Sequence, residues 1–211
     1  MTIEIYADIA CPWCYIGEAR FFEALEKFEH RDDVDVVYRP FQLDPSLPDK
    51  PVPLKESLRQ KFGERTDATL RHTASAAGKE GLTLNWDEAL AVNTMNAHRL
   101  LRLALNEYDA ATQRKVATRL FEAHFTHGVN VADTGALQQL AVDSGMDAER
   151  VEAYLASDEG RDEVVQEIAR AQSIGVQAVP TFVFNGKSAV QGAQPADVFG
   201  EALATIYEEE R

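Results

Sequence analysis

The chain is poor in cysteine and in positive charge. Its 211 residues include two cysteines, and 21 Lys and Arg are set against 35 Asp and Glu, which gives a formal net charge of −14. Two cysteines are too few for the disulfide framework of a small secreted scaffold. The acidic balance argues against nucleic acid and anionic membranes as partners, because both are bound by clusters of Lys and Arg. We interpret the net charge as a solubility feature.

Signals for export and for membrane insertion are also missing. The first residues, MTIEIYADIA, contain no basic stretch followed by an apolar core, so we expect no secretory signal. No apolar run approaches the ~20 residues that a membrane helix needs. We therefore expect a cytoplasmic protein. In a reducing cytosol, a close pair of cysteines is more often catalytic, redox-sensing or metal-binding than structural.

The first part of the chain alternates between strand and helix signals. Apolar residues make up 45% of the sequence and charged residues 27%, which is ordinary for a globular protein with a real core. Alternation predicts strands over 3–7 and 35–41, and helical spacing predicts a helix over 12–29. The segment 44–53 holds four of the eight prolines and is predicted to be an irregular linker.

The middle of the chain shows only helical patterns, and the last quarter returns to mixed signals. Between 54 and 158 we expect no strand, with a first helical pattern broken at Gly78 and Gly81. The other predicted helices of this block cover 93–108, 115–125, 133–145 and 147–157. The last quarter predicts a helix over 160–175, a hairpin over 180–191 turning at Asn-Gly, and a helix over 194–210.

This order predicts an α/β fold in which a large all-helical insertion interrupts β-α-β and α-β-β-α segments. We expect residues 1–45 and 160–211 to form one α/β domain. Residues 46–159 would then form the helical insertion domain.

The two cysteines stand in the segment Cys11-Pro12-Trp13-Cys14, where the first strand passes into the first helix. Proline suits the first helical position, so Cys11 is expected at the N-cap. There, unpaired backbone N–H groups and the helix dipole favour its thiolate form. Cys14 lies three residues on, within disulfide reach, and is expected to be the more buried sulfur. Cys11 would attack the substrate, and Cys14 would resolve the mixed disulfide.

Two other interpretations of the pair stay open at this stage. A lone C-x-x-C can be half of a zinc site, for which His124 and His127 are the best additional ligands in the sequence. The cysteines can also be plain core residues. Against zinc, the sequence holds no second C-x-x-C, and His124 follows Leu120 by four residues as a partly buried helix histidine would. Against plain core cysteines, Pro12 and Trp13 lie between them and the pair stands where a strand passes into a helix.

The motifs together resemble a known family. CPWCYIG after the first strand, NTMNAHRLL within the helical block and GVQAVPTFVFNGKSAVQGAQP near the end are similar to the DsbA-type thioredoxin-fold proteins. The narrower resemblance is to the FrnE-like branch of dithiol–disulfide oxidoreductases or isomerases, and it covers essentially the whole chain. It implies a thioredoxin-like fold and a cis peptide at Val179-Pro180 facing the cysteines. The backbone of Val179 would then pair with an extended substrate.

Further candidate residues surround this centre. Trp13, beside Pro12, is expected to form an apolar lip next to the reactive thiol, and Phe41 is expected to border the site. The related kappa-type glutathione transferases and 2-hydroxychromene-2-carboxylate isomerases imply a substrate pocket built partly from the insertion. The matching stretch holds Asn93 and His98, which are therefore candidate substrate-binding residues. Asp8 either tunes the thiols or merely ends the first strand.

The sequence thus predicts thiol–disulfide exchange on protein or small-molecule dithiols and disulfides. Glutathione or thioredoxin is the expected electron partner, and no metal or organic cofactor is needed because the cysteine pair carries two electrons. The alternative is a glutathione-dependent isomerase or transferase. Relatives of that type usually have serine at the position of Cys11. A chaperone-like binding role is a third possibility. Neither the substrate nor the direction of exchange can be read from the sequence, although a reducing compartment favours reductase or isomerase work.

Overall fold

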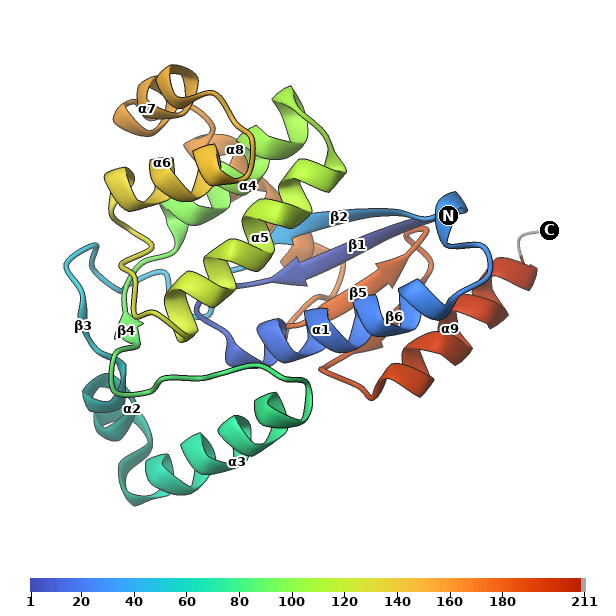
Figure 1. Ribbon diagram of the computed structural model, residues 1–211, viewed down its shortest axis with the longest axis horizontal. Helices are drawn as coiled ribbons and strands as arrows, with labels where there is room; N and C mark the ends of the chain where they lie inside the picture. Colours follow the sequence, from blue (N-terminus) through green and yellow to red (C-terminus); the bar gives the residue numbers. More distant parts are fainter. Residues whose placement is uncertain (210–211) are drawn as a thin grey trace.

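A four-stranded sheet lies at the centre of the molecule. The computed structural model describes residues 1–209. The strands β1 and β2 run parallel, whereas β5 and β6 are antiparallel to their neighbours, in the order β2-β1-β5-β6 (Figure 1). The bounds are β1 Thr2–Ala7, β2 Asp35–Pro40, β5 Thr181–Phe184 and β6 Ser188–Gln191. The predicted α/β fold of thioredoxin-like type is confirmed.

Helices cover both faces of this sheet. Successive side chains of β5 point to opposite faces, and each contacts a helix there. Phe182 packs on Phe21 of α1 and Phe199 of α9, whose rings lie 5.1 and 4.6 Å from its own. Val183 points to the opposite face and joins a second core with Ala171 of α8. Because helices cover both faces of the sheet at β5, all four of its residues are buried, and three of them are apolar. The helices are α1 Pro12–Lys27, α2 Leu54–Phe62, α3 Thr66–Lys79, α4 Met95–Glu107, α5 Ala110–Phe125, α6 Thr134–Asp143, α7 Ala148–Ala156, α8 Arg161–Ser173 and α9 Ala196–Glu209.

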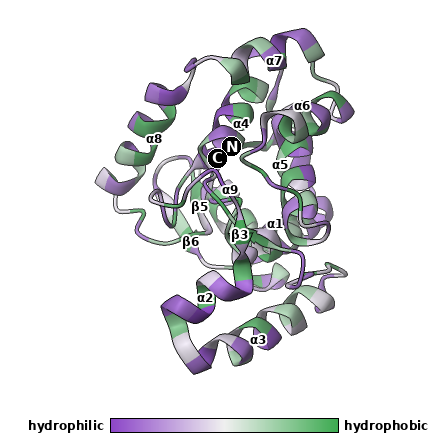
Figure 2. Ribbon diagram, turned by 90° about the vertical axis from the view of Figure 1, so that its left-hand side faces the viewer, coloured by the Kyte–Doolittle hydropathy of each residue, from purple (hydrophilic) through white to green (hydrophobic). Residues whose placement is uncertain are grey.

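The helical block divides into two parts in space. Helices α4 to α7 gather at one end of the sheet, and α2 with α3 forms a separate arm at its lower side (Figures 1 and 2). The expectation that this block contains no strand is wrong, because β4 (Leu90–Ala91) pairs antiparallel with β3 (Val52–Pro53). Two residues carry too little alternation to be recognised as a strand. The division into domains 1–45 with 160–211 and 46–159 stays a prediction.

The predicted helix ends are mostly set by the expected side chains. Asp133 and Asp147 each accept a backbone N–H three residues on, at 2.8 Å, and so cap α6 and α7. The predicted break at Gly78 is wrong, because α3 continues through this residue to Lys79. The Asn-Gly turn is confirmed, with φ of 48° at Asn185 and 68° at Gly186. Residue 210, where the last helix was predicted to end, lies outside the described residues.

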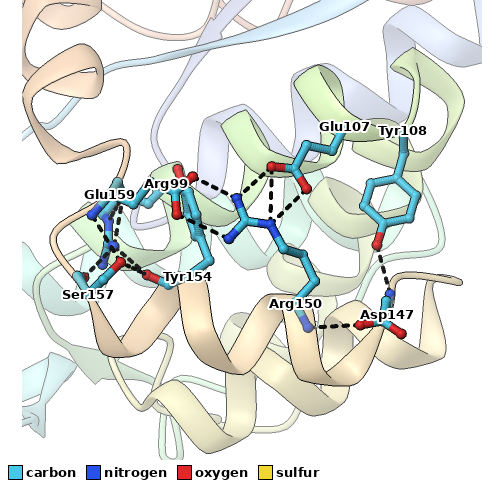
Figure 3. A network of polar contacts seen from close by, with 8 residues as sticks. All are labelled: Arg99, Glu107, Tyr108, Asp147, Arg150, Tyr154, Ser157 and Glu159. Carbon is cyan, nitrogen blue, oxygen red and sulfur yellow. Dashed lines mark hydrogen bonds and ion pairs between the residues drawn. The ribbon is translucent and has the colours of Figure 1, made fainter.

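A buried arginine fastens α4 to the end of α7 (Figure 3). The guanidinium of Arg99 donates to the carbonyl oxygens of Tyr154, Ser157 and Glu159 at 2.6 to 2.9 Å. Arg150 bridges the carboxylates of Glu107 and Glu159 nearer the surface. The guanidinium thus adds a donor to the Tyr154 carbonyl, which also accepts from Ser157, and it binds two carbonyls of the segment that follows α7. This network fixes α4 and the side chains that it carries.

Candidate active site

The two cysteines lie at the N-terminus of α1. Cys11 is the N-cap, with φ −96° and ψ 110°, and Pro12 begins the helix as predicted. The carbonyl oxygen of Cys11 accepts the N–H of Cys14 at 3.0 Å. Both residues are free thiols, and their exposed fractions are 5% for Cys11 and 2% for Cys14. The expected difference in burial is therefore present but small.

The loop before β5 faces this helix end. The Val179–Pro180 peptide is cis, and Cys11 Sγ lies 3.8 Å from the carbonyl oxygen of Val179. Both features were implied by the family resemblance, and both are confirmed. The neighbouring turn of α1 approaches so closely that a Cβ on Gly17 would lie 2.9 Å from Pro180 Cγ. A glycine at this position therefore lets the helix and the loop touch.

Asp8 is the buried acid of the site. Its exposed fraction is 1%, its Oδ2 accepts the N–H of Leu43 at 2.7 Å, and its Oδ1 accepts the N–H of Ala10 at 3.2 Å. Burial by itself would raise the pKa of this carboxyl. The hydrogen bond and the charge of His98 oppose burial most strongly, the N–H of Leu43 and the hydroxyl of Thr94 follow, and the pKa lies below its usual value. Asp8 is thus ionised at neutral pH.

The environment of Cys14 opposes its ionisation. Burial raises the pKa of the Cys14 thiol well above its usual value, and the neighbouring Cys11 thiol and the charge of Asp8 add to the rise. A thiol in this state keeps its proton until a base removes it. The two sulfurs therefore differ in setting, because Cys11 Sγ meets the loop carbonyl of Val179 whereas the Cys14 thiol is buried and under the influence of the Asp8 charge.

The remaining predicted residues hold the surroundings of the site. Trp13 is half-buried, and its ring centre lies 5.7 Å from that of His72 on α3, so the arm of α2 and α3 reaches the lip of the site. Phe41 is buried in the core that also contacts Val179, on the sheet face opposite α1, so it supports the loop from beneath. Asn93 donates to the carbonyl oxygens of Pro45 and Leu47 at 3.1 and 2.9 Å, which ties the proline-rich segment to α4.

His98 lies deeper than a substrate-contacting side chain is expected to lie. Its exposed fraction is 3%, and its Nε2 is 3.4 Å from Asp8 Oδ1. The structure thus brings His98 to the acid behind the cysteines, and Asn93 to the loop beside them. Their roles in substrate binding stay predictions, and the surroundings of both residues favour a supporting role.

The sequence reasoning missed a second buried acid on α1. Glu18 is 4% exposed and accepts a hydrogen bond from the hydroxyl of Thr118. Burial raises the pKa of Glu18 to about 7, against the opposing hydrogen bonds of Thr118 and Tyr38. The signal was available, because Glu18 follows Cys14 by four residues and therefore lies on the same buried face of the helix.

The histidines that were considered as zinc ligands are placed differently. His124 is buried on α5, and neither of its ring nitrogens meets a hydrogen-bond partner among the described residues. Burial lowers the pKa of His124 to about 4, so the ring is neutral near pH 7. Within residues 1–209, no three His, Cys, Asp or Glu side chains are grouped to hold a metal ion. None of the described helices has the length and apolar character to cross a membrane.

A thioredoxin-like sheet, a C-x-x-C pair at a helix N-terminus and a facing cis-proline loop define a dithiol protein of the thioredoxin superfamily. The family model for the DSBA-like thioredoxin domain matches residues 2–204, and the chain belongs to this family.

Individual relatives agree with this assignment. The solved structure of a probable DsbA oxidoreductase from Streptomyces coelicolor is 38% identical, with a TM-score of 0.91 over 99% of this chain and 91% of that chain. The uncharacterized protein YwbO of Bacillus subtilis (strain 168) is 28% identical over 96% of this chain and 95% of its own length. The cytosolic disulfide reductase DsbM from Pseudomonas aeruginosa is 20% identical and shares the fold, with a TM-score of 0.67 over 99% of both chains.

Proposed function

We propose that this protein, as a thiol–disulfide oxidoreductase, uses Cys11 as the attacking thiol and Cys14 as the resolving thiol. The observation that carries the proposal is the contrast between the two sulfurs. Cys11 is the N-cap of α1, and its Sγ lies 3.8 Å from the carbonyl oxygen of Val179, in the loop that would meet the substrate. Cys14 is one turn deeper and retains its proton because it is buried.

The reaction proceeds in two exchanges when a substrate disulfide is reduced. The Cys11 thiolate attacks one substrate sulfur, the substrate S–S bond breaks, and the other substrate sulfur leaves as a thiolate. Cys14 then gives its proton to the Asp8 carboxylate and attacks Cys11 Sγ. The mixed disulfide breaks, the second substrate thiolate leaves, and a Cys11–Cys14 disulfide remains. Two electrons pass from the dithiol to the substrate, and the reverse sequence oxidises a dithiol.

Substrate recognition in this proposal uses the backbone of the loop before β5. Val179 offers its backbone to an extended peptide or to glutathione, and Pro12, Trp13 and Pro180 supply apolar contact around the sulfur. Trp13 is half-buried and its ring contacts that of His72, which supports a role for Trp13 at the apolar edge of the site.

Glutathione is the small-molecule partner that we favour, with thioredoxin as the protein alternative. The relative DsbM has been solved with GSH, and it is described as a cytosolic disulfide reductase. We extend both features to this chain as proposals. The protein would then work in the cytoplasm, as a reductase or isomerase, with no bound metal or organic cofactor.

A redox titration against glutathione tests the proposal. The Cys11–Cys14 pair should close reversibly, and a potential of about −270 mV indicates a reductase whereas about −120 mV indicates an oxidant. Cys11→Ser should abolish exchange, and Cys14→Ser should trap a mixed disulfide on Cys11. If the pair does not close at any glutathione poise, or if Cys11→Ser retains full exchange, the proposed function is wrong.

A further inference from the structure

His98 and Asp8 form a buried pair behind the dithiol. His98 Nε2 lies 3.4 Å from Asp8 Oδ1, and each side chain is 2% exposed. Among the described residues His98 Nε2 has no partner in hydrogen-bond geometry, so the contact with Asp8 is a short buried ion-pair distance. An isolated carboxylate at this depth is strongly disfavoured, so its partners decide whether it carries a proton.

The four partners of Asp8, which are Ala10, Leu43, Thr94 and His98, differ in what they contribute. The N–H groups of Ala10 and Leu43 are fixed backbone donors close to the site. His98 and Thr94 both come from the helical block, and of the two His98 has the stronger influence in lowering the pKa of Asp8. The state of Asp8 therefore depends on a side chain ninety residues away in sequence.

His98 also lines a small polar cavity on its other side. This cavity has a volume of about 80 Å³ and lies between β2, α4, α5 and α8. Such a volume has room for several water molecules. His98 thus contacts Asp8 and also lines a polar cavity whose other lining residues come from β2, α4, α5 and α8.

We propose that His98 is a positioning residue for the resolving step, and that it acts by keeping Asp8 ionised so that Asp8 can take the proton of Cys14. The inference rests on the proposed function. In the second exchange the Cys14 S–H bond breaks, its proton moves to Asp8, and its electron pair forms the bond to Cys11 Sγ while the substrate thiolate leaves. His98 touches neither the sulfur atoms nor the substrate.

The test separates the two exchanges with glutathione disulfide as the substrate. In the Cys14→Ser background, acid quenching and mass spectrometry follow the first exchange as glutathione adds to Cys11. With Cys14 present, the same method follows the second exchange as the glutathionylated form disappears. Each rate is measured from about pH 3 to pH 8, so that the acid limb of the wild type, in which the pKa of Asp8 lies below its usual value, falls inside the range.

The matched pair of variants is His98→Phe and His124→Phe. Both histidines are buried, they lie on the neighbouring helices α4 and α5, and both interact electrostatically with Asp8. They differ in that His124 is neutral near pH 7. The charged and titratable groups around the pair are Cys11 and Cys14 of α1, His124 of α5, and across the cavity Arg39, Arg102 and Glu167. Arg39 is ion-paired with Glu4, and Arg102 with Glu167, so their charges are the same in both variants.

The expected result is specific to the second exchange. In His98→Phe the influence that most strongly lowers the pKa of Asp8 is gone, so burial raises this pKa. The pH below which the second exchange slows should therefore be at least one unit higher than in the wild type. Below this pH the second exchange is about tenfold slower, since one pKa unit corresponds to a tenfold change in the ionised fraction. His98→Gln, which keeps an N–H donor, should recover part of the rate. His124→Phe should leave the profile unchanged.

Several outcomes overturn the inference. A second exchange in His98→Phe that matches the wild type at every pH removes the role of His98. An Asp8→Asn variant that closes as fast as the wild type removes the proton acceptor. If His98→Phe does not fold, by circular dichroism, the profile of His98→Gln decides. Loss of the first exchange in the Cys14→Ser background contradicts the proposed function instead.

Discussion

The close approach of Gly17 to Pro180 makes a quantitative prediction about the substitution Gly17→Ala. The added Cβ would lie 2.9 Å from Pro180 Cγ and 3.4 Å from the Cα of Ala193. Carbon atoms prefer a separation of about 3.5 Å, so the loop must move by about 0.6 Å away from α1. Both neighbours belong to backbone or ring atoms that cannot rotate away. The loop that carries Val179 must therefore shift with Pro180.

The expected change in stability is the sum of two opposing effects. Alanine is favoured over glycine inside a helix by about 1 kcal/mol. Forcing a methyl group into a packed contact costs about 1–3 kcal/mol. We therefore expect Gly17→Ala to lower the free energy of unfolding by about 0–2 kcal/mol, and a shift of this size beside Cys11 to slow disulfide exchange by about tenfold.

Gly200→Ala is the matched control. Gly200 also lies inside a helix, α9. Apart from its chain neighbours and the backbone of its own helix, no described atom is within 4 Å of the Cβ that it would gain. This variant should be more stable by about 1 kcal/mol and should exchange disulfides at the wild-type rate. Urea unfolding and the reduction of glutathione disulfide measure both quantities. Equal stabilisation by the two substitutions, or an unchanged rate in Gly17→Ala, would refute the reasoning.

Three further predictions concern buried polar groups. Arg99→Met removes the buried guanidinium that donates to the carbonyls of Tyr154, Ser157 and Glu159 and should cost about 2–4 kcal/mol in urea unfolding, whereas Arg150→Met, at the surface, should cost about 1 kcal/mol or less. Glu18 has a folded pKa of about 7 against 4.5, so its protonated form stabilises the fold, and stability should fall by up to about 3 kcal/mol as the pH rises through this range. Glu18→Gln should remove that slope, and an unchanged slope would contradict the assignment. His124 has a folded pKa of about 4 against 6.5, so stability should fall as the pH drops from 6.5 to 4, and His124→Phe should flatten this loss in urea midpoints measured across the range.

The parts of the fold that follow from local patterns were predictable from the sequence. Alternation and helical spacing gave the strands and helices of the sheet layer, and Asp133 and Asp147 marked helix starts because N-capping is a local interaction. The position of Cys11 before Pro12 also follows from local chemistry. The strand β4 did not follow, because its two residues are held by β3 through tertiary pairing and show no period of their own.

For the site, too, residues in contiguous motifs were predictable, whereas contacts that depend on tertiary packing were not. The dithiol and the proline loop are contiguous motifs, and both were found where the sequence placed them. The pair of Asp8 and His98 was not predicted as a pair, since it depends on the packing of α4 against the end of β1. Glu18 was overlooked although its spacing from Cys14 was visible, because a charged residue on a helix is by default assigned to the solvent face.

The convergence on Asp8 also bears on what the helical insertion does. The loop after β2 supplies the N–H of Leu43, and α4 supplies His98 and, through its N-cap, the hydroxyl of Thr94. A buried carboxylate that loses such partners becomes costly and takes up a proton. Loss of the α4 partners would therefore raise the pKa of Asp8, although the N–H donors of Ala10 and Leu43 would remain. Helix α4 and its N-cap thus contribute to the electrostatic surroundings of the acid nearest the dithiol.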